Sequence, residues 1–326
     1  MNGCRKGKSS VCPISDKQPV LVITGPTASG KTSAAIQLAE KLDGEIISAD
    51  SMQVYRGMDI GTAKATRDEQ ARVPHHLLDI RNPGESFSVA EYQLLATDTI
   101  KAIQARGKSV IFSGGTGQYL SAMMEGLVYS PASVNLDLRE QLNREVEAEG
   151  LEKLWQQLTL IDPESAARLA PTDQKRIIRA LEVYRQTGET ISAHQARSHQ
   201  AGPAFTYIGF CLNHERSLLY ERINRRVDAM IDTGLLDEVK WLVGLGLPAG
   251  STCLQAIGYK ELIRHLDGQL SLPDAISLIQ QSSRRYAKRQ LTWFRKMTNM
   301  MWLENKETDD AVQTMAAVWQ NFFENV

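Results

Sequence analysis

The stretch GPTASGKT, residues 25–32, has the residue types and spacing of a loop that binds phosphate. It matches the pattern GxxxxGK[ST] at every fixed position. In such a loop the backbone N–H groups point inward, the glycines allow a tight path, the lysine reaches the terminal phosphates and the last hydroxyl ligates Mg²⁺. We therefore predict a pyrophosphate- or nucleotide-binding loop, with Mg²⁺ on Thr32, formed by Gly25, Pro26, Thr27, Ala28, Ser29, Gly30, Lys31 and Thr32.

The position of the nearest carboxylate bears on what chemistry follows phosphate binding. Enzymes that transfer or hydrolyse phosphoryl groups usually have an Asp at the end of an apolar strand beside the loop. Here the apolar run SVIF ends at Ser113, and the carboxylate instead follows the run EIISA, as Asp50. Asp50 has three candidate roles: general base, indirect Mg²⁺ ligand, or turn former. Its place at the carboxyl end of a parallel strand favours a functional role.

The segment SGGTG, residues 113–117, is a second small-residue turn at the end of a strand. Its backbone could approach a ligand closely, and the Thr116 hydroxyl could donate to a phosphate oxygen. The alternative is a plain strand-to-helix turn.

The surrounding sequence predicts a parallel sheet that positions these residues. Apolar, β-branched runs predict strands at 19–24, 45–49, 109–112 and 207–212, and helical spacing follows the loop and covers 89–104. Such alternation is typical of α/β proteins. We predict a P-loop NTPase-like parallel sheet core with helices on both faces.

The middle of the chain has only helical patterns, at 136–149, 151–158, 163–169 and 174–187. We therefore predict a basic flexible tail at 1–18, a catalytic core at 19–130 and 205–326, and an all-helical insertion at 131–204. After the strand at 207–212 we expect one amphipathic helix over 215–245 and further helices to the C-terminus.

Composition excludes several classes of protein. The chain has 326 residues, 42% of them hydrophobic and 23% charged, with a formal net charge of -1, so any contact with nucleic acid must use a local basic patch. No run of about 18 apolar residues predicts a membrane helix, and we expect a cytoplasmic monomer. The cysteines form no CxxC pair, and the sequence around the adjacent His75 and His76 offers no third metal ligand, so no zinc site is predicted.

Several motifs together resemble the family of tRNA dimethylallyltransferases, the isopentenylpyrophosphate transferases. Besides residues 25–32 they are IISADSMQVYRGMDIGTAK (46–64), PHHLLDI (74–80), FSVAEY (87–92), SGGTGQYL (113–120), RIIRALEVY (176–184), QAIGYKEL (255–262) and RRYAKRQLTWFR (284–295). The resemblance covers about residues 19–300, in the family's order.

The resemblance implies a reaction in which phosphate leaves. In this family the loop binds the pyrophosphate of dimethylallyl pyrophosphate, and the dimethylallyl group moves to N6 of adenosine 37 in tRNAs that read codons beginning with U, giving i6A37 and pyrophosphate. Asp50 is then expected to be the base that removes the N6 proton. Lys31, Mg²⁺ on Thr32, and Thr116 are expected to stabilise the leaving group.

The resemblance also implies which residues contact the anticodon stem-loop of tRNA. The predicted contacts are Asp50, Ser51, Met52, Gln53, Thr116, Arg139, Lys175, Arg176, Ile177, Ile178, Arg179, Gln255, Ala256, Ile257, Gly258, Tyr259, Lys260, Lys288, Arg289, Gln290, Leu291, Thr292, Trp293, Phe294 and Arg295. Lys175 departs from the family, because many relatives have Gln at that position.

Two basic segments complete the predicted site. Arg222 and Arg226 lie four residues apart, match paired positions of the family and are expected to reach the pyrophosphate, although a solvated basic face is the alternative. Residues 284–296 contain no acid, and their basic side chains are expected to contact tRNA phosphates. On that helix the opposite stripe, expected to be packed, is Tyr286, Gln290, Trp293 and Met297.

Other functions remain open at this point. An adenylate isopentenyltransferase would use the same loop and base on AMP, ADP or ATP, a P-loop kinase or NTPase would turn over ATP, and a non-catalytic RNA-binding module would need no base. The helical insertion and the basic segment at 284–296 favour tRNA, because a free nucleotide needs no extended basic surface.

Overall fold

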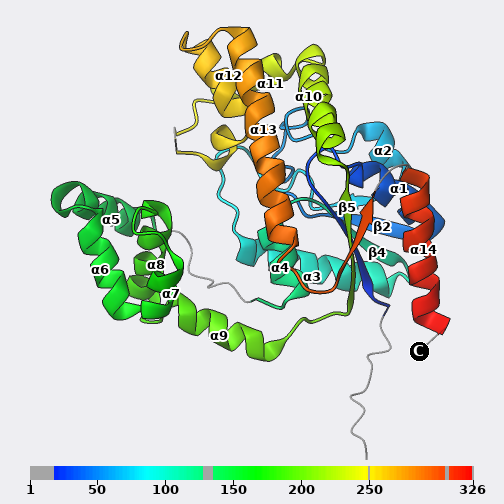
Figure 1. Cartoon of the computed structure of the whole chain (residues 1–326), viewed down its shortest axis with the longest axis horizontal. Coiled ribbons are helices and arrows are strands. Elements are labelled where there is room, and N and C mark those ends of the chain that lie inside the picture. The colour runs from blue at the N-terminus through cyan, green and yellow to red at the C-terminus, as the bar shows by residue number, and fades with distance from the viewer. Residues whose placement is uncertain (1–17, 128–134, 249, 305–307, 325–326) are drawn as a thin grey trace, which may run out of the picture.

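The computed structural model of the chain describes residues 18–127, 135–248, 250–304 and 308–324. The tail predicted for residues 1–18 lies outside this part, except for Gln18. In Figure 1 a sheet with its covering helices occupies one side of the molecule, and a group of helices from the middle of the chain lies apart from it.

The core is a six-stranded parallel sheet in the order β3-β2-β4-β1-β5-β6. Its strands are β1 (Val20–Thr24), β2 (Gly44–Ser48), β3 (His75–His76), β4 (Ser109–Ser113), β5 (Tyr207–Asn213) and β6 (Met300–Glu304). The four predicted strands are present. The expectation of helices alone after residue 215 was wrong at β6, because periodicity in a run of five residues does not separate a strand from a helix.

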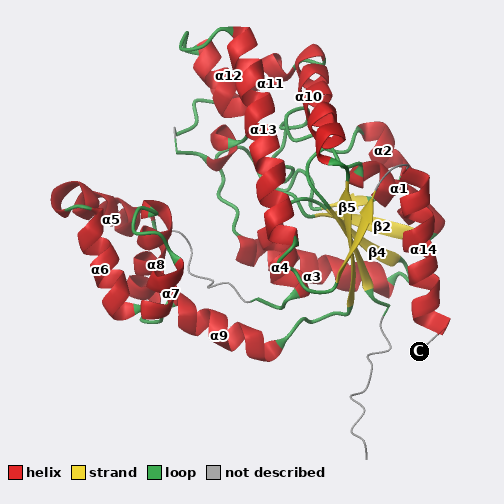
Figure 2. Cartoon of the chain, viewed as in Figure 1, coloured by secondary structure: helices red, strands yellow, loops and turns green. Residues whose placement is uncertain are grey.

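Helices cover both faces of the sheet (Figure 2). Along β1, Val20 and Val22 pack with α3 (Val89–Ala105) and α4 (Gly117–Met124), whereas Leu21 and Ile23 pack with α1 (Lys31–Lys41) and α14 (Thr308–Glu324). Successive side chains of a strand point to opposite faces. Burial on both faces therefore explains why the strands are continuous apolar runs in the sequence.

A third apolar cluster joins residues 52–60 to the C-terminal half. The elements of the C-terminal half in this cluster are α10 (Arg216–Asp232), α11 (Leu235–Gly244), the 3₁₀ turn Thr252–Gln255, α12 (Tyr259–Leu266) and α13 (Leu272–Phe294). The short helix α2 (Arg67–Arg72) follows residues 52–60 in the chain and is not part of the cluster. The single helix predicted over 215–245 was wrong. Its pattern is split at Gly234, whose φ of 103° lies in the left-handed region that glycine tolerates.

The middle of the chain forms α5 (Leu136–Glu149), α6 (Leu151–Ile161), α7 (Pro163–Arg168), α8 (Gln174–Thr187) and α9 (Ile191–Ala201). We call α5–α9 the helical insertion. It has its own apolar cluster, which includes Leu142, Leu158 and Leu181. No helix within the described residues is long and apolar enough to cross a membrane.

Candidate active site

The predicted phosphate loop connects the end of β1 to the start of α1. Gly25 has a φ of 149°, and a Cβ built on it would lie 2.4 Å from the carbonyl oxygen of Leu212, so only glycine fits there. Gly30, with a φ of 90°, precedes α1, whose N-terminus has no side-chain cap. The first N–H groups of the helix are therefore directed at the space in front of the loop, where an anion can accept them.

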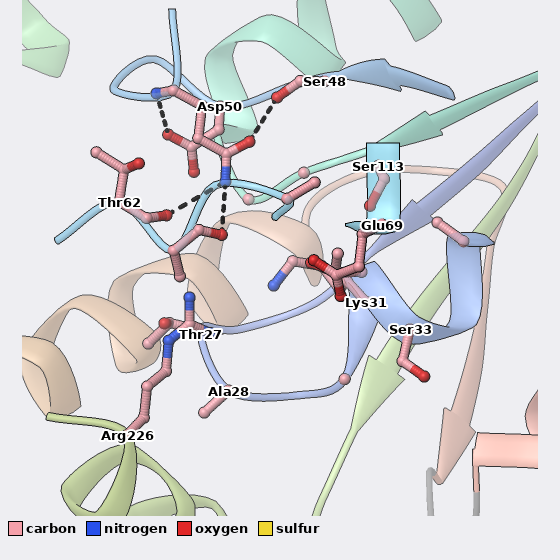
Figure 3. A pocket seen from close by; sticks show the side chains of 18 of the residues that line it. Thr27, Ala28, Lys31, Ser33, Ser48, Asp50, Thr62, Glu69, Ser113 and Arg226 are labelled. Atoms are coloured by element: carbon pink, nitrogen blue, oxygen red, sulfur yellow. Dashed lines mark hydrogen bonds between the residues drawn. The ribbon is translucent and has the colours of Figure 1, made fainter. Parts of the chain in front are cut away.

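That space is a cavity of about 600 Å³, which we call the first cavity (Figure 3). In Figure 3 the side chain of Lys31 points into it, and its Nζ donates to the carbonyl oxygen of Pro26 over 2.8 Å. The pKa of Lys31 is lowered to about 8, first by burial and then by the nearby charge of Arg226, while Asp50 and Cys211 act in the opposite direction. A bound anion would relieve both unfavourable effects.

Asp50 lies just after β2 and also lines the first cavity, although β4 separates β2 from β1. Its Oδ1 accepts from the backbone N–H groups of Met52, over 2.9 Å, and Gln53, over 3.4 Å. Asp50 is therefore a turn former, as one of the predicted alternatives had it. Because a carboxylate has two oxygens, this turn fixes the group without using all of its acceptor capacity.

The end of β4 has no carboxylate, as predicted. Ser113, the last residue of β4, lies opposite Ile23 of β1 in the sheet and lines the first cavity. Among the described residues, no group of three or more His, Cys, Asp or Glu side chains could hold a metal ion. His76 instead hydrogen-bonds Glu45 over 2.6 Å, and His75 Nδ1 donates to the carbonyl oxygen of Val73.

The turn at 113–117 connects the ends of β1, β2 and β4. Thr24 Oγ1 donates to the carbonyl oxygen of Gly114 over 2.9 Å, and Thr116 N donates to that of Ala49 over 3.0 Å. The Thr116 hydroxyl accepts from the N–H of Ser51 over 3.0 Å. Thr116 thus holds the residue next to Asp50, and its contact with a phosphate oxygen stays a prediction.

Both predicted arginines of α10 reach the first cavity. Arg222 Nε donates to the carbonyl oxygen of Ala28 in the loop over 2.9 Å. Burial lowers the pKa of Arg226, and the charge of Asp50 opposes that shift. Sequence reasoning missed Arg225, which also lines this cavity and pairs with Glu221 at 3.6 Å. Its position between the two predicted arginines was the only available signal.

A second cavity, of about 340 Å³, adjoins the first. Both cavities are lined by Thr27, Asp50, Thr62, Arg226 and Tyr286. The remaining walls of the second cavity combine apolar side chains with a few polar ones, and include Met52, Val227, Met230, Gln255, Ile257, Lys260, Ile279 and Arg289. Apolar side chains beside hydrogen-bonding groups suit a flat organic ligand such as a nucleobase. The carboxylate and the guanidinium therefore lie where the contents of the two cavities would meet.

The predicted tRNA contacts divide into exposed and buried side chains. Exposed are Lys175, Arg176, Gln255, Lys260, Lys288, Arg289, Thr292, Trp293 and Arg295. Side-chain contact with RNA is contradicted for the buried ones, which are Ile177, Ile178, Ala256, Tyr259, Gln290 and Phe294. A helix exposes one face to solvent, so a continuous run of residues necessarily includes inward positions.

Three further predicted tRNA contacts have partners within the chain. Arg139 and Arg179 both pair with Glu182, at 2.8 Å and 3.0 Å. The Gln53 side chain accepts from Ser48 Oγ over 2.8 Å and donates to the carbonyl oxygens of residues 62 and 63. These residues organise the surfaces that carry them.

The predicted packed stripe of α13 was correct for Gln290 and Met297, which are buried, and wrong for Trp293, which is 43% exposed. Trp293 lies on the edge of the stripe, where its Nε1 still donates to Ser121 Oγ over 3.1 Å. Its ring is therefore anchored at one end and accessible at the other.

Comparisons with known proteins find relatives over most of the chain. The family model described as IPP transferase matches residues 53–297. A tRNA dimethylallyltransferase of Trichlorobacter lovleyi is 48% identical over 303 residues, which cover 93% of this chain and 99% of that protein. The crystal structure of the tRNA isopentenylpyrophosphate transferase of Bacillus halodurans has a TM-score of 0.68 at 42% identity, covering 94% of this chain and 98% of that one.

A structure of a eukaryotic dimethylallyltransferase acting on tRNA has a TM-score of 0.82 at 29% identity, and covers 94% of this chain and 80% of that one. The phosphate loop, Asp50 and the paired arginines of α10 thus stand in a fold shared with these enzymes. The chain belongs to the IPP transferase family.

Proposed function

We propose that the chain transfers the dimethylallyl group from dimethylallyl pyrophosphate to N6 of adenosine 37 in tRNA. The observation that carries the proposal is the pair of adjoining cavities, one facing a phosphate loop and the other lined by both apolar and polar side chains, with Asp50 and Arg226 lining both. The reaction needs this arrangement, because the neutral adenine must approach carbon 1 of the dimethylallyl group from one side while the anionic pyrophosphate leaves from another.

The first cavity suits the pyrophosphate. The N-terminus of α1, Lys31, Arg222 and Arg226 would all stabilise the negative charge that grows on the leaving oxygen. The lowered pKa of Lys31 supports this assignment, because a dianionic or trianionic ligand would restore the favourable environment of the ammonium. Arg225 would add charge at the same cavity.

The second cavity suits the adenine. The lone pair of N6 is delocalised into the purine, so removal of its proton as the new bond forms lowers the barrier. In the step, the bond between carbon 1 and the pyrophosphate oxygen breaks, the bond between carbon 1 and N6 forms, and one N6 proton passes to Asp50. Its Oδ2 accepts no hydrogen bond from the described residues, while Oδ1 anchors the group to Met52.

Mg²⁺ fits the site as a companion of the pyrophosphate. The chain supplies the Thr32 hydroxyl, and the described residues contain no carboxylate cluster that would hold the ion alone. Mg²⁺ commonly keeps several waters and takes its other ligands from substrate phosphates. Its chemistry here would be to neutralise charge on the leaving pyrophosphate.

The tRNA would approach along exposed basic side chains of α13 and of the helical insertion. Lys288, Arg289 and Arg295 are exposed on α13, and Lys175 and Arg176 are exposed on α8. Cationic side chains such as these contact phosphates without reading sequence. Because Arg289 also lines the second cavity, the basic surface of α13 reaches the proposed adenine site.

The reaction is tested by the mass of unmodified tRNA before and after incubation with the chain and dimethylallyl pyrophosphate. We expect the gain of one dimethylallyl group on one nucleoside. The variant Asp50→Asn keeps an oxygen for the Met52 N–H and should lower the rate at saturating substrates by roughly 10² to 10⁴ fold while tRNA still binds. Asp98→Asn, at an exposed position of α3, is the matched control.

The same assay separates the other functions. For this purpose AMP or ATP replaces tRNA in parallel incubations. A dimethylallyl group on AMP with none on tRNA would identify an adenylate isopentenyltransferase, and ATP turnover without prenyl transfer would identify a kinase or NTPase. Undiminished prenyl transfer by Asp50→Asn would remove Asp50 as the base.

A further inference from the structure

Gln290 is a buried amide on α13 that reaches both glycine-rich turns of the site. Its side chain is 5% exposed. Its Oε1 accepts from the N–H of Thr27 in the phosphate loop over 2.9 Å, and its Nε2 donates to the carbonyl oxygen of Gly115 over 2.9 Å. A further contact joins the amide to the hydroxyl of Tyr286. One side chain thus connects the P-loop, the turn after β4 and the helix that carries the basic surface.

The chemistry of the two backbone partners determines the amide orientation. The N–H of Thr27 can only donate and the carbonyl of Gly115 can only accept, so the oxygen of Gln290 must face the first and the nitrogen the second. A carboxylate at this position would place an acceptor against the Gly115 carbonyl. An aliphatic side chain would leave two backbone polar groups without their partner.

The turn at 113–117 is shaped to admit this helix. A Cβ on Gly115 would lie 2.3 Å from Nε2 of Gln290, and a Cβ on Gly117 would lie 2.5 Å from Cδ1 of Trp293. Neither glycine has a positive φ, so close approach of α13 is what requires them. Gly115 and Gly117 of the SGGTG motif therefore face α13, whereas Gly114 lies against the backbone of Ala49, where a Cβ would be 2.2 Å from the carbonyl oxygen.

Opposite faces of α13 have different partners. Lys288, Arg289 and Arg295 are exposed, whereas Gln290 and Phe294 point inward. Figure 1 shows α13 running from beside α12 to α4, which begins at the turn after β4. The helix proposed to meet tRNA is thus hydrogen-bonded directly to the loop proposed to hold pyrophosphate.

We propose that Gln290 is a positioning residue, which holds the Thr27 N–H and the Gly115 carbonyl in place so that the loop keeps the shape that binds pyrophosphate. The inference rests on the proposed function. Gln290 lines the first cavity, and each end of its amide is hydrogen-bonded to the backbone there. Its role separates it from its exposed neighbours on α13, which are expected to affect tRNA binding alone.

The test compares Gln290→Met, Gln290→Glu and the matched control Gln280→Met in the full chain. Gln280 lies on the same helix and donates to Asp228 at the surface. Titration calorimetry with inorganic pyrophosphate should give a Kd that is roughly tenfold higher for Gln290→Met and unchanged for Gln280→Met. The KM for dimethylallyl pyrophosphate should rise in parallel, with the Kd for tRNA unchanged.

Gln290→Glu gives a readout that general destabilisation would not produce. Its carboxylate repels both the Gly115 carbonyl and the pyrophosphate, so we expect a Kd higher than that of Gln290→Met at pH 8. Protonation of the carboxyl restores a donor to Gly115. The ratio of its Kd to that of the wild-type chain should therefore fall as the pH is lowered from 8 to 6, whereas the ratio for Gln290→Met stays constant.

Wild-type pyrophosphate affinity and KM in Gln290→Met would overturn the inference, as would equal losses of pyrophosphate and tRNA binding. If Gln290→Met does not fold, the pH response of Gln290→Glu decides. Failure of the proposed function would appear separately, because the wild-type chain itself would then leave tRNA unmodified, whatever its affinity for pyrophosphate.

Discussion

Lys31 and Arg222 at the first cavity differ from the arginines of the helical insertion in their hydrogen-bond partners. At the cavity, Lys31 and Arg222 donate to backbone carbonyls of the loop, so their charges are not neutralised by a carboxylate. In the helical insertion, by contrast, Arg139 and Arg179 share the carboxylate of Glu182. Arg185 is likewise paired with Glu145, at 2.8 Å.

This difference shows which charges are prepared for a ligand and which hold the protein together. A cation that is buried without a counter-ion is unfavourable until an anion arrives, so the cavity gains stability when its ligand binds. A carboxylate shared by two arginines neutralises half of their charge, which stabilises the insertion and leaves less for RNA. Changes at the cavity should therefore affect catalysis, and changes at Glu182 should affect folding.

Among the changes that test this comparison, Lys31→Met has the largest expected effect. Loss of a preorganised cation at the leaving group should lower kcat/KM for dimethylallyl pyrophosphate by roughly 10² to 10³ fold, with unchanged thermal unfolding. Steady-state prenyl transfer to tRNA measures it. The control is Lys41→Met at the other end of α1, where Nζ contacts Gln313 at the surface. An equal loss of activity in Lys31→Met and Lys41→Met would contradict a specific role of the Lys31 charge at the first cavity.

Glu182→Gln should have the next largest effect, on the stability of the helical insertion. The Glu182 side chain is fully buried, but Arg139 and Arg179 are partly exposed, so the loss of its charged hydrogen bonds should cost about 1 to 3 kcal/mol. Urea unfolding at pH 7 measures the change, with Glu149→Gln, from the exposed pair with Lys153, as control. Unchanged stability would mean that the shared carboxylate does not hold the insertion.

The pKa of Glu182 sharpens this prediction. Burial alone would raise it, but the hydrogen bonds from Arg139 and Arg179 prevail, so the pKa is lowered in the folded chain. A lowered carboxyl pKa stabilises the fold above the unfolded value, about 4.3, and this contribution is lost as the pH falls through the folded value. The difference between wild type and Glu182→Gln should therefore shrink in acid.

The pH dependence of pyrophosphate binding should show a smaller effect at the cavity. The pKa of free Lys31 is lowered to about 8, and the charged form is the one that binds an anion. The Kd for inorganic pyrophosphate should therefore rise above pH 8, by at most about tenfold per pH unit, until the raised pKa of the complex is reached. Lys31→Met should lack this rise, and a rise of the same size in that variant would assign it to another group.

Lys288→Ala should have the smallest effect, on tRNA binding alone. Removing one phosphate contact should weaken binding a few-fold and reduce the slope of log Kd against log salt by about 1. Filter binding at several salt concentrations measures it. Lys240→Ala, from the exposed pair with Asp237 on α11, is the control and should leave the slope unchanged.

Much of the fold could be predicted because its signals are local. The phosphate loop, the apolar strands around it and the helices of the insertion each follow from spacing within about 15 residues. Predictions were wrong where local spacing was ambiguous, at the five-residue strand β6, or where one glycine interrupted a long amphipathic pattern, at Gly234. The predicted tRNA contacts included buried positions such as Ile177, because a motif match does not show which way a side chain points.

The sequence by itself predicted a phosphate-binding loop at residues 25–32, showed that no carboxylate follows β4 and carried the motifs of the family. The tertiary structure decided that Asp50, Arg226 and Tyr286 line both cavities and that Gln290 serves the phosphate loop. The physical reason is separation along the chain. Gln290 is 263 residues from Thr27 and 175 from Gly115, and no local pattern encodes hydrogen bonds between groups that only packing brings together.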